Sequence, residues 1–230
     1  MEARRLSREI EKLKKRILVL SAEVERALQR AVESVTEQRA DLAQAVIDGD
    51  EEIDRQEVDL EEECLKLLAL HQPVAIDLRF IVAVLKINSD LERIGDLAVN
   101  IAQRTLMLAA SPGLATIFDF REMADRVQQM LRSSLDALVN LDTPLAYDVI
   151  ASDDEVDVMN RQMYKRAADA IMQNPEQADR LIMLLSVSRL LERVSDHATN
   201  IAEDIVYLSS GEIIRHSRAF QRAASTAPVE

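Results

Sequence analysis

The sequence contains no tryptophan, and only three tyrosines and four phenylalanines occur among its 230 residues. Aromatic rings build the platforms on which nucleic-acid bases stack, and so few rings argue against such a platform. Glycine and proline are also scarce, at four and five residues, while Ala, Leu, Glu, Arg and Gln are abundant. These five residue types favour helices, so the composition predicts an all-α protein.

Cys64 is the only cysteine, which excludes an intrachain disulfide and gives no sign of an oxidising compartment. Its apolar neighbours Leu65, Leu67 and Leu68 place it in the predicted core rather than in a catalytic site. No apolar run approaches the ~20 residues that span a bilayer, and the first residues lack the apolar stretch of a signal peptide. We therefore expect a cytoplasmic protein.

The formal net charge of −13 disfavours nucleic acid as a partner, because Lys and Arg must neutralise phosphates in such complexes. The N-terminal segment is an exception, since it carries seven basic residues within its first 16 positions. Such a segment can meet anionic lipid or an acidic partner. The interleaved Glu2, Glu9 and Glu11 favour the simpler interpretation of a solvated helix face.

Glycine, proline and serine divide the chain into long segments. We predict helix breaks near Asp48–Gly49, His71–Pro73, Ser111–Gly113, Thr143–Pro144, Ser152, Asn174–Pro175 and Ser210–Gly211. Between the breaks, apolar residues recur at three- and four-residue spacing, which predicts long amphipathic helices.

An internal repeat organises the sequence. The segment LAQAVIDGDEEID from Leu42 resembles LAYDVIASDDEVD from Leu145, and LERIGDLAVNIAQ from Leu91 resembles LERVSDHATNIAE from Leu191. Each half therefore reads as three helices, the second of which is expected to start at the acidic cluster. This division predicts a first bundle over 1–112, a second over 113–224 and a flexible tail over 225–230.

Both halves carry carboxylates four residues apart, a spacing that puts each pair on one helix face. The pairs are Asp50 and Asp54, Glu92 and Asp96, Asp153 and Asp157, and Glu192 and Asp196. Repulsion within such a pair costs only about 0.2–0.5 kcal/mol on an exposed helix, so it does not by itself require a bound cation.

Hairpin geometry brings these pairs together. Asp54 stands 19 residues before Pro73, and Glu92 stands 19 residues after it. The second half repeats this arrangement around Pro175, with Asp157 and Glu192 at nearly equal distances from the turn. Four carboxylates then meet at one level of each bundle, which is an oxygen-rich site suited to divalent or trivalent metal ions.

Simpler explanations stay open at this point. Acidic residues at a helix start cap the helix and complement its dipole, which would account for the pairs at Asp50 and Asp153. The other two pairs can be surface charge balanced by Arg93 and Arg193.

No motif for catalysis is visible. None of His71, His197 and His216 follows a glutamate by three residues, as in ferritin-like metal sites. His197 can line the acidic site, but its counterpart in the first half is Leu97. The chain also lacks a phosphate-binding glycine loop and a nucleophile elbow, so we expect no enzymatic activity.

The segments DLRFIVAVLKINSDLERIGDLAVNIA from Asp77 and LERVSDHATNIAEDIVYLSSGEIIRH from Leu191 resemble the two signature segments of PhoU proteins. The resemblance implies two pseudo-symmetric three-helix bundles of spectrin-like form, and a family metal-binding motif that maps onto all eight residues above. It leaves the metal open among Fe, Mn, Mg, Zn and Ca. Leu97 and Gln103 depart from the family pattern, so the two sites need not be equivalent.

The resemblance also implies a function. PhoU proteins are negative regulators of phosphate uptake and of the phosphate-starvation response, acting as adaptors between a phosphate transporter ATPase subunit and a sensor histidine kinase. The same resemblance implies membrane association only through these partners, and it allows a homodimer. The alternatives are a carboxylate-bridged metal enzyme, of phosphatase or oxidase type, and a structural helical scaffold.

Overall fold

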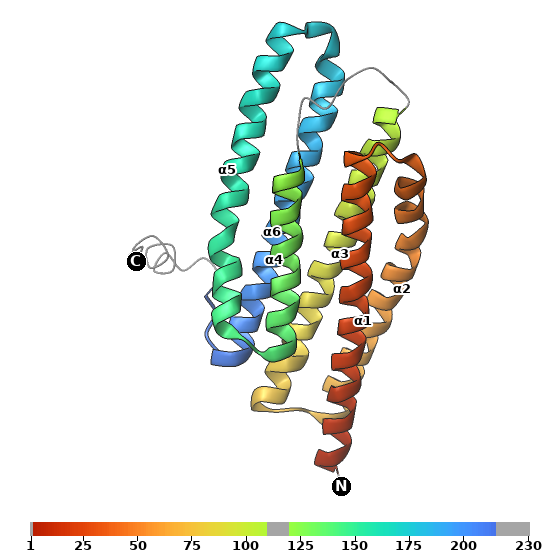
Figure 1. Cartoon of the computed structure of the whole chain (residues 1–230). Coiled ribbons are helices and arrows are strands. Elements are labelled where there is room, and N and C mark those ends of the chain that lie inside the picture. Colours follow the sequence, from red (N-terminus) through yellow and green to blue (C-terminus); the bar gives the residue numbers. More distant parts are fainter. Residues whose placement is uncertain (1, 110–119, 215–230) are drawn as a thin grey trace, which may run out of the picture.

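The structure is a computed structural model that describes residues 2–109 and 120–214. Over these residues it consists of long helices and one short 3₁₀ turn, η1 (Pro175–Gln177) (Figure 1). The helices are α1 (Glu2–Thr36), α2 (Ala40–His71), α3 (Ala75–Ala109), α4 (Arg121–Asn140), α5 (Thr143–Gln173) and α6 (Ala178–Ser210). The predicted domain boundary at 112/113 and the predicted tail 225–230 lie outside the described residues.

The helices form two three-helix bundles, α1–α3 and α4–α6, which confirms the predicted fold class. Each helix buries a stripe of apolar residues at the predicted three- and four-residue spacing. In α1 this stripe consists of Ile10, Leu13, Ile17, Leu20, Val24 and Leu28. Cys64 is fully buried in the first bundle, as predicted, and burial raises the pKa of its thiol to about 12.

Two of the predicted helix breaks are wrong. α2 continues through Gly49, and α5 continues through Ser152. Glycine inside a helix costs only about 0.5–1 kcal/mol relative to alanine, which the packing of α2 against α1 and α3 offsets. The Ser152 hydroxyl donates to the Asp148 carbonyl at 2.7 Å, so its polar group is satisfied within the helix.

The other predicted breaks that fall on described residues are where the sequence predicts them, and the one near Ser111–Gly113 lies outside those residues. Asp142 caps α5, because its carboxylate accepts from the Leu145 amide at 3.0 Å. Gly211 ends α6 in the left-handed region, at a φ of 80°. The positive φ favours glycine at this position, and a β-carbon there would also displace the flexible guanidinium of Arg79 from α3.

α3 and α6 run antiparallel and join the two bundles. The Lys86 ammonium donates to Asp204 at 3.1 Å, and the Arg104 guanidinium donates to Ser186 at 3.1 Å. Lys86 and Ser186 occupy equivalent places in the repeat, and so do Arg104 and Asp204. The two contacts are therefore exchanged by the pseudo-two-fold relation between the halves.

Candidate functional site

Four of the predicted site residues lie near one another between α2 and α3. Burial, together with the charges of Asp54 and Asp96, raises the pKa of Asp50 from 3.8 to about 6. Burial and the charges of Asp96 and Asp54 also raise the pKa of Glu92. Carboxylates influence one another in this way only at short range, so Asp50, Asp54, Glu92 and Asp96 form one group, which we call the first acidic cluster.

The second bundle repeats this arrangement between α5 and α6. The pKa of Asp153 is raised to about 6 by burial and by the charge of Asp196, while the neighbouring Ser195 hydroxyl lowers it. Burial and the charge of Asp196 raise the pKa of Glu192, and burial and the charge of Asp157 raise that of Asp196. These residues, Asp153, Asp157, Glu192 and Asp196, form the second acidic cluster.

The clusters do not cap helices. α2 begins at Ala40, so Asp50 lies almost three turns inside it, and α5 likewise begins at Thr143, well before Asp153. The expectation that these helices start at the acidic residues is wrong. Helix capping and the helix dipole act only in the first turn, and they therefore do not explain these carboxylates.

Basic residues balance part of the charge, as the surface-charge interpretation expects. Arg93 lies 3.4 Å from both Glu92 and Asp96. In the second cluster, Arg189 contacts Glu192 at 3.0 Å and Arg161 contacts Asp157 at 3.4 Å. The pKa values of Glu92 and Glu192 are nevertheless raised, so burial and carboxylate repulsion outweigh these cations.

The arrangement provides hard oxygen ligands but not a formed coordination sphere. Within residues 2–109 and 120–214, no group of three or more His, Cys, Asp or Glu side chains is arranged to hold a metal ion. Glu192 is only 8% exposed, and its Oε2 atom has no hydrogen-bond partner. A buried carboxylate oxygen without a partner is unfavourable, and a cation at the cluster would satisfy it.

The sequence analysis missed a fifth carboxylate beside the first cluster. Burial and the charges of Glu61 and Asp54 raise the pKa of Glu57, whose Oε1 accepts from the buried Asn88 amide at 2.8 Å. The repeat offsets match Glu57 with Asn160 and Asn88 with Ser188. This counterpart pair is also bonded, with the Ser188 hydroxyl donating to Asn160 at 2.7 Å. The repeat alignment could have revealed this pair.

His197 lies close enough to the second acidic cluster for its charge to lower the pKa of Asp196 against the effect of burial, but its hydrogen bond is to the other bundle. Its Nδ1 lies 2.8 Å from Asp90 Oδ1 on α3, and the Asn200 amide donates to the same oxygen at 3.2 Å. The Asn100 amide donates to the backbone carbonyl of Asp96 at 2.8 Å. Both asparagines therefore hydrogen-bond, but neither bonds the carboxylate of the aspartate one turn before it.

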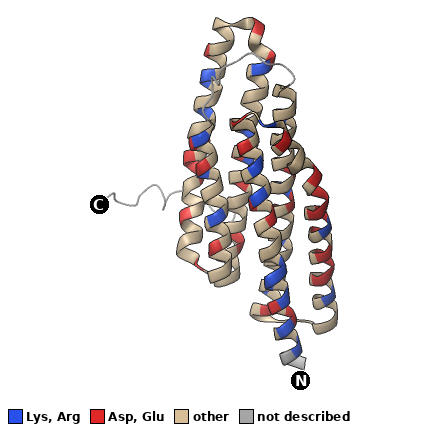
Figure 2. Cartoon of the chain, turned by 45° about the vertical axis from the view of Figure 1, so that its right-hand side comes forward, with Lys and Arg blue, Asp and Glu red and all other residues tan. Residues whose placement is uncertain are grey.

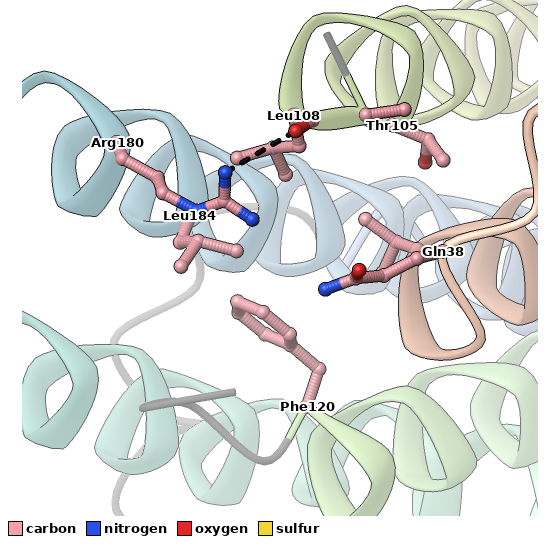
Figure 3. A pocket seen from close by; sticks show the side chains of 8 residues that line it. Gln38, Thr105, Leu108, Phe120, Arg180 and Leu184 are labelled. Atoms are coloured by element: carbon pink, nitrogen blue, oxygen red, sulfur yellow. Dashed lines mark hydrogen bonds between the residues drawn. The ribbon is translucent and has the colours of Figure 1, made fainter. Parts of the chain in front are cut away.

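A cavity near the ends of α1 and α3 offers little room for a ligand. It holds about 20 Å³ and is lined mainly by apolar side chains such as Leu108, Phe120 and Leu184 (Figure 3). Such a volume accommodates about one water molecule. Arg180 donates to the Leu108 carbonyl at 3.2 Å there, which satisfies an acceptor at the end of α3.

None of the helices that the structure describes has a stretch long and apolar enough to span a bilayer.

The fold and the paired clusters define a class of protein: a duplicated helical bundle with carboxylates at one level of each half. Comparison with known proteins identifies the family. The model of the PhoU domain matches residues 3–105 and 120–205, and the chain belongs to the PhoU family.

Individual relatives agree with this assignment. The chain is 40% identical over 212 residues to the phosphate-specific transport system accessory protein PhoU homolog of Aquifex aeolicus, covering 92% of this chain and 96% of that protein. It is 39% identical over 188 residues to the Deinococcus radiodurans protein of the same description, covering 82% and 88%. The crystal structure of PhoU from Pseudomonas aeruginosa has a TM-score of 0.86 at 33% identity, covering 90% of this chain and 99% of that one.

Proposed function

We propose that this chain is an accessory protein of a phosphate import system, and that it represses phosphate uptake and the phosphate-starvation response. Its similarity over nearly the whole length of relatives described as phosphate-specific transport system accessory proteins carries this proposal. In this role it contacts the transporter's ATPase subunit and a sensor histidine kinase at the cytoplasmic face of the membrane. It acts by binding rather than by catalysis.

We propose further that the two acidic clusters bind divalent or trivalent metal ions. The donor set supports this, because eight carboxylates supply hard oxygen ligands and the buried Glu192 oxygen lacks a partner. In the first cluster, Asp50, Asp54, Glu92 and Asp96 would hold the ion, with Glu57 beside them. In the second cluster, Asp153, Asp157, Glu192 and Asp196 would do so. Burial and the charges of neighbouring carboxylates raise the pKa values of Asp50 and Asp153, and a bound cation would oppose both effects.

Regulation requires that the partners bind one state of the protein more tightly than another. Metal binding offers such a difference, because it changes the charge on the face that α2 and α3, or α5 and α6, present between them. The antiparallel contact of α3 with α6 places one helix from each cluster in direct contact. A rotation of either helix would therefore reach the other bundle.

The proposed function is tested by alkaline phosphatase activity, as a reporter of the starvation response, in phosphate-rich cells with and without the gene. We expect high activity after deletion and low activity when the wild-type gene is restored. Unchanged low activity after deletion, in a strain without a second copy, would refute the repressor role.

The metal proposal has its own test. Elemental analysis of the purified protein should show less bound metal in a Glu192→Gln/Asp196→Asn variant than in the wild type. An Asp41→Asn variant is a matched control, because Asp41 is exposed and pairs with Arg39 outside both clusters. Equal metal content in all three proteins would contradict the assignment of these residues.

A further inference from the structure

One end of the first bundle exposes apolar side chains that the fold does not bury. At the turn between α2 and α3, Leu70 is 72% exposed, Val74 is 74% exposed and Ile76 is 55% exposed. Leu78, on the next turn of α3, is 40% exposed. We call these four residues the apolar tip. Clustered exposed apolar side chains mark contact with a protein or a membrane more often than isolated ones do.

The backbone at this turn adds to the observation. Gln72 and Ala75 both have positive φ, of 43° and 50°, although neither is glycine. These two residues flank Pro73 and Val74, and Val74 is left pointing into solvent while Pro73 is buried. A left-handed conformation at a residue other than glycine costs about 1–2 kcal/mol per residue. The turn therefore holds an unfavourable backbone while exposing an apolar side chain.

The second bundle shows that the fold does not need this tip. By the repeat offsets, Leu70, Ile76 and Leu78 correspond to Gln173, Glu176 and Ala178. The turn between α5 and α6 is thus more polar at the equivalent positions, and it lies at the opposite end of the molecule (Figure 1). The second hairpin also exposes Met172 and Ile182, but it does not place large apolar residues at the positions equivalent to the tip, and this difference points to a role for the apolar tip beyond folding.

Basic residues lie at the same end of the first bundle. The Lys14 ammonium lies 5.6 Å from the centre of the Phe80 ring, which sets the level of α1 against α3. Arg8 precedes Lys14 by six residues and Val74 precedes Phe80 by six residues, so Arg8 lies near the level of the apolar tip. In Figure 2 the ribbon of the N-terminal half of α1 carries many blue segments, which mark Lys and Arg.

Arg5 and Arg8 carry the positive charge of this end. Both side chains are exposed, and neither has an ion-pair partner among the residues that the structure describes. The nearby Lys12 pairs with Glu9 at 3.0 Å. The corresponding helix of the second bundle, α4, has 20 residues where α1 has 35. The basic extension and the apolar tip are thus both features of the first bundle, at one end of it.

We propose that this end of the first bundle binds directly to an anionic lipid surface, with the apolar tip entering the headgroup region and Arg5 and Arg8 contacting lipid phosphates. Val74 and its neighbours project from a turn, a convex shape that a bilayer accepts without a complementary groove. Apolar side chains combined with basic residues are the usual means of peripheral membrane binding.

The net charge of −13 does not prevent this contact. Sixteen residues of α3 separate Ile76 from Glu92, which is about 24 Å along a helix. The Debye length at physiological ionic strength is about 8 Å, so the acidic clusters are screened from the surface that the tip would touch. The charges nearest the tip are those of Asp77 on α3 and of the first turns of α1, where Arg5 and Arg8 have no ion-pair partner among the side chains that the structure describes.

The test is co-sedimentation of the full chain with vesicles. The wild type should bind vesicles of phosphatidylcholine and phosphatidylglycerol in equal parts, and it should bind phosphatidylcholine vesicles more weakly. High salt should release it from the anionic vesicles, because each basic residue near the surface contributes about a fivefold change in binding.

Two double variants test whether binding depends on the apolar tip or on exposed apolar side chains in general, and a third tests the basic residues. Leu70→Gln/Ile76→Gln should weaken binding to anionic vesicles at least about tenfold, since both side chains leave the apolar tip. Met172→Gln/Ile182→Gln at the other hairpin should leave binding unchanged, although Met172 and Ile182 are also 72% and 55% exposed. Arg5→Gln/Arg8→Gln should weaken binding and reduce its dependence on salt.

Absence of wild-type binding to anionic vesicles would overturn the proposal, and so would equal losses in the two hairpin variants. If the tip variant instead loses a soluble protein partner while no variant binds vesicles, the surface belongs to a protein contact and the lipid proposal fails. The proposal does not depend on metal binding or on repression, because purified protein and vesicles suffice to test it.

Discussion

His197 on α6 lies 2.8 Å from Asp90 on α3, and this hydrogen bond joins the two bundles close to both acidic clusters. The repeat does not duplicate it. By the repeat offset, the equivalents of Asp90 and His197 are Leu190 and Leu97, so the pseudo-symmetric position holds two apolar residues. Unlike the contacts of Lys86 and Arg104, which the repeat exchanges, this polar contact has an apolar pair at its pseudo-symmetric position.

This asymmetry predicts a non-additive effect on stability. His197→Leu removes a partner from the Asp90 carboxylate, whose side chain is only 14% exposed, and should cost about 1–3 kcal/mol. Asp90→Leu/His197→Leu copies the apolar pair of the other side, and should cost less than the sum of the two single changes. Urea denaturation of the four proteins measures this. Additive losses would show that the two residues do not act as a pair.

A second prediction concerns pH. The pKa of Asp50 and that of Asp153 are raised to about 6 in the folded protein, so the unfolded chain loses these protons first as pH rises. Their contribution therefore lowers the free energy of unfolding as pH rises from about 4 to 6, in the absence of metal. Asp50→Asn should raise the melting temperature at about pH 7 and change it little at about pH 4.

Asp41→Asn provides the control of opposite sign. A hydrogen bond from Arg39 lowers the pKa of Asp41, so its ionised form stabilises the folded state at neutral pH. This variant should gain nothing at about pH 7. The measurement is the melting temperature of each variant and of the wild type at both pH values, with a chelator present. If Asp50→Asn and Asp41→Asn respond alike to pH, then burial and the neighbouring carboxylates do not raise the pKa of Asp50.

The third prediction concerns the pKa of Asp50, and it uses the one position at which the first cluster has Gly95 and the second has Ser195. A β-carbon at Gly95 would lie 3.6 Å from Asp50 Oδ1 and 3.3 Å from Ile53, while the equivalent residue in the second cluster is Ser195. The Ser195 hydroxyl donates to the Glu192 carbonyl at 2.7 Å, and it lies beside Asp153 and lowers the pKa of that carboxyl against the effect of burial. Gly95→Ser should therefore lower the pKa of Asp50, because it adds a donor beside the carboxylate.

NMR titration of the Asp50 carboxyl carbon measures this shift. Gly95→Ala is the matched control, since it adds the same β-carbon without the hydroxyl. It should not lower the pKa of Asp50. Equal shifts in the two variants would mean that a change in packing, rather than the hydroxyl donor, is responsible.

The sequence predicted which carboxylates lie near one another because two spacing rules act together. Four-residue spacing fixed which carboxylates share a helix face, and equal distances from Pro73 fixed which faces meet. The predicted starts of the second helix in each half were wrong, because Gly49 and Ser152 were interpreted as helix breaks. Tertiary packing overrode that local preference, so Asp50 and Asp153 lie inside long helices.

The contacts between the bundles were not predictable from the sequence. Lys86 and Asp90 lie in the first signature segment, and their partners Asp204 and His197 lie in the second, more than 100 residues away. Nothing in the spacing of these residues indicates which of them pair. Only the antiparallel register of α3 and α6 brings these pairs together. The pair of Glu57 and Asn88 was accessible in principle, since the repeat aligns it with Asn160 and Ser188.

That last pair gives the final prediction. The Asn88 amide donates to Glu57, which is a titrating carboxyl group, whereas Ser188 donates to Asn160, which does not titrate. A hydrogen bond to a charged group contributes about 1.5–3 kcal/mol, compared with about 0.5–1.5 kcal/mol for a neutral pair. The cost of Asn88→Ala should therefore be larger at about pH 7 than at about pH 4, where Glu57 is protonated.

Ser188→Ala is the matched control in the second bundle. Its cost should be the same at both pH values, because neither member of its pair changes charge. Comparing each variant with itself at two pH values cancels the different volumes that the two substitutions remove. Free energies of unfolding from urea titrations provide the measurement. If the cost of Asn88→Ala is independent of pH, then the amide does not stabilise the ionised form of Glu57, and Glu57 is not held charged beside the first cluster.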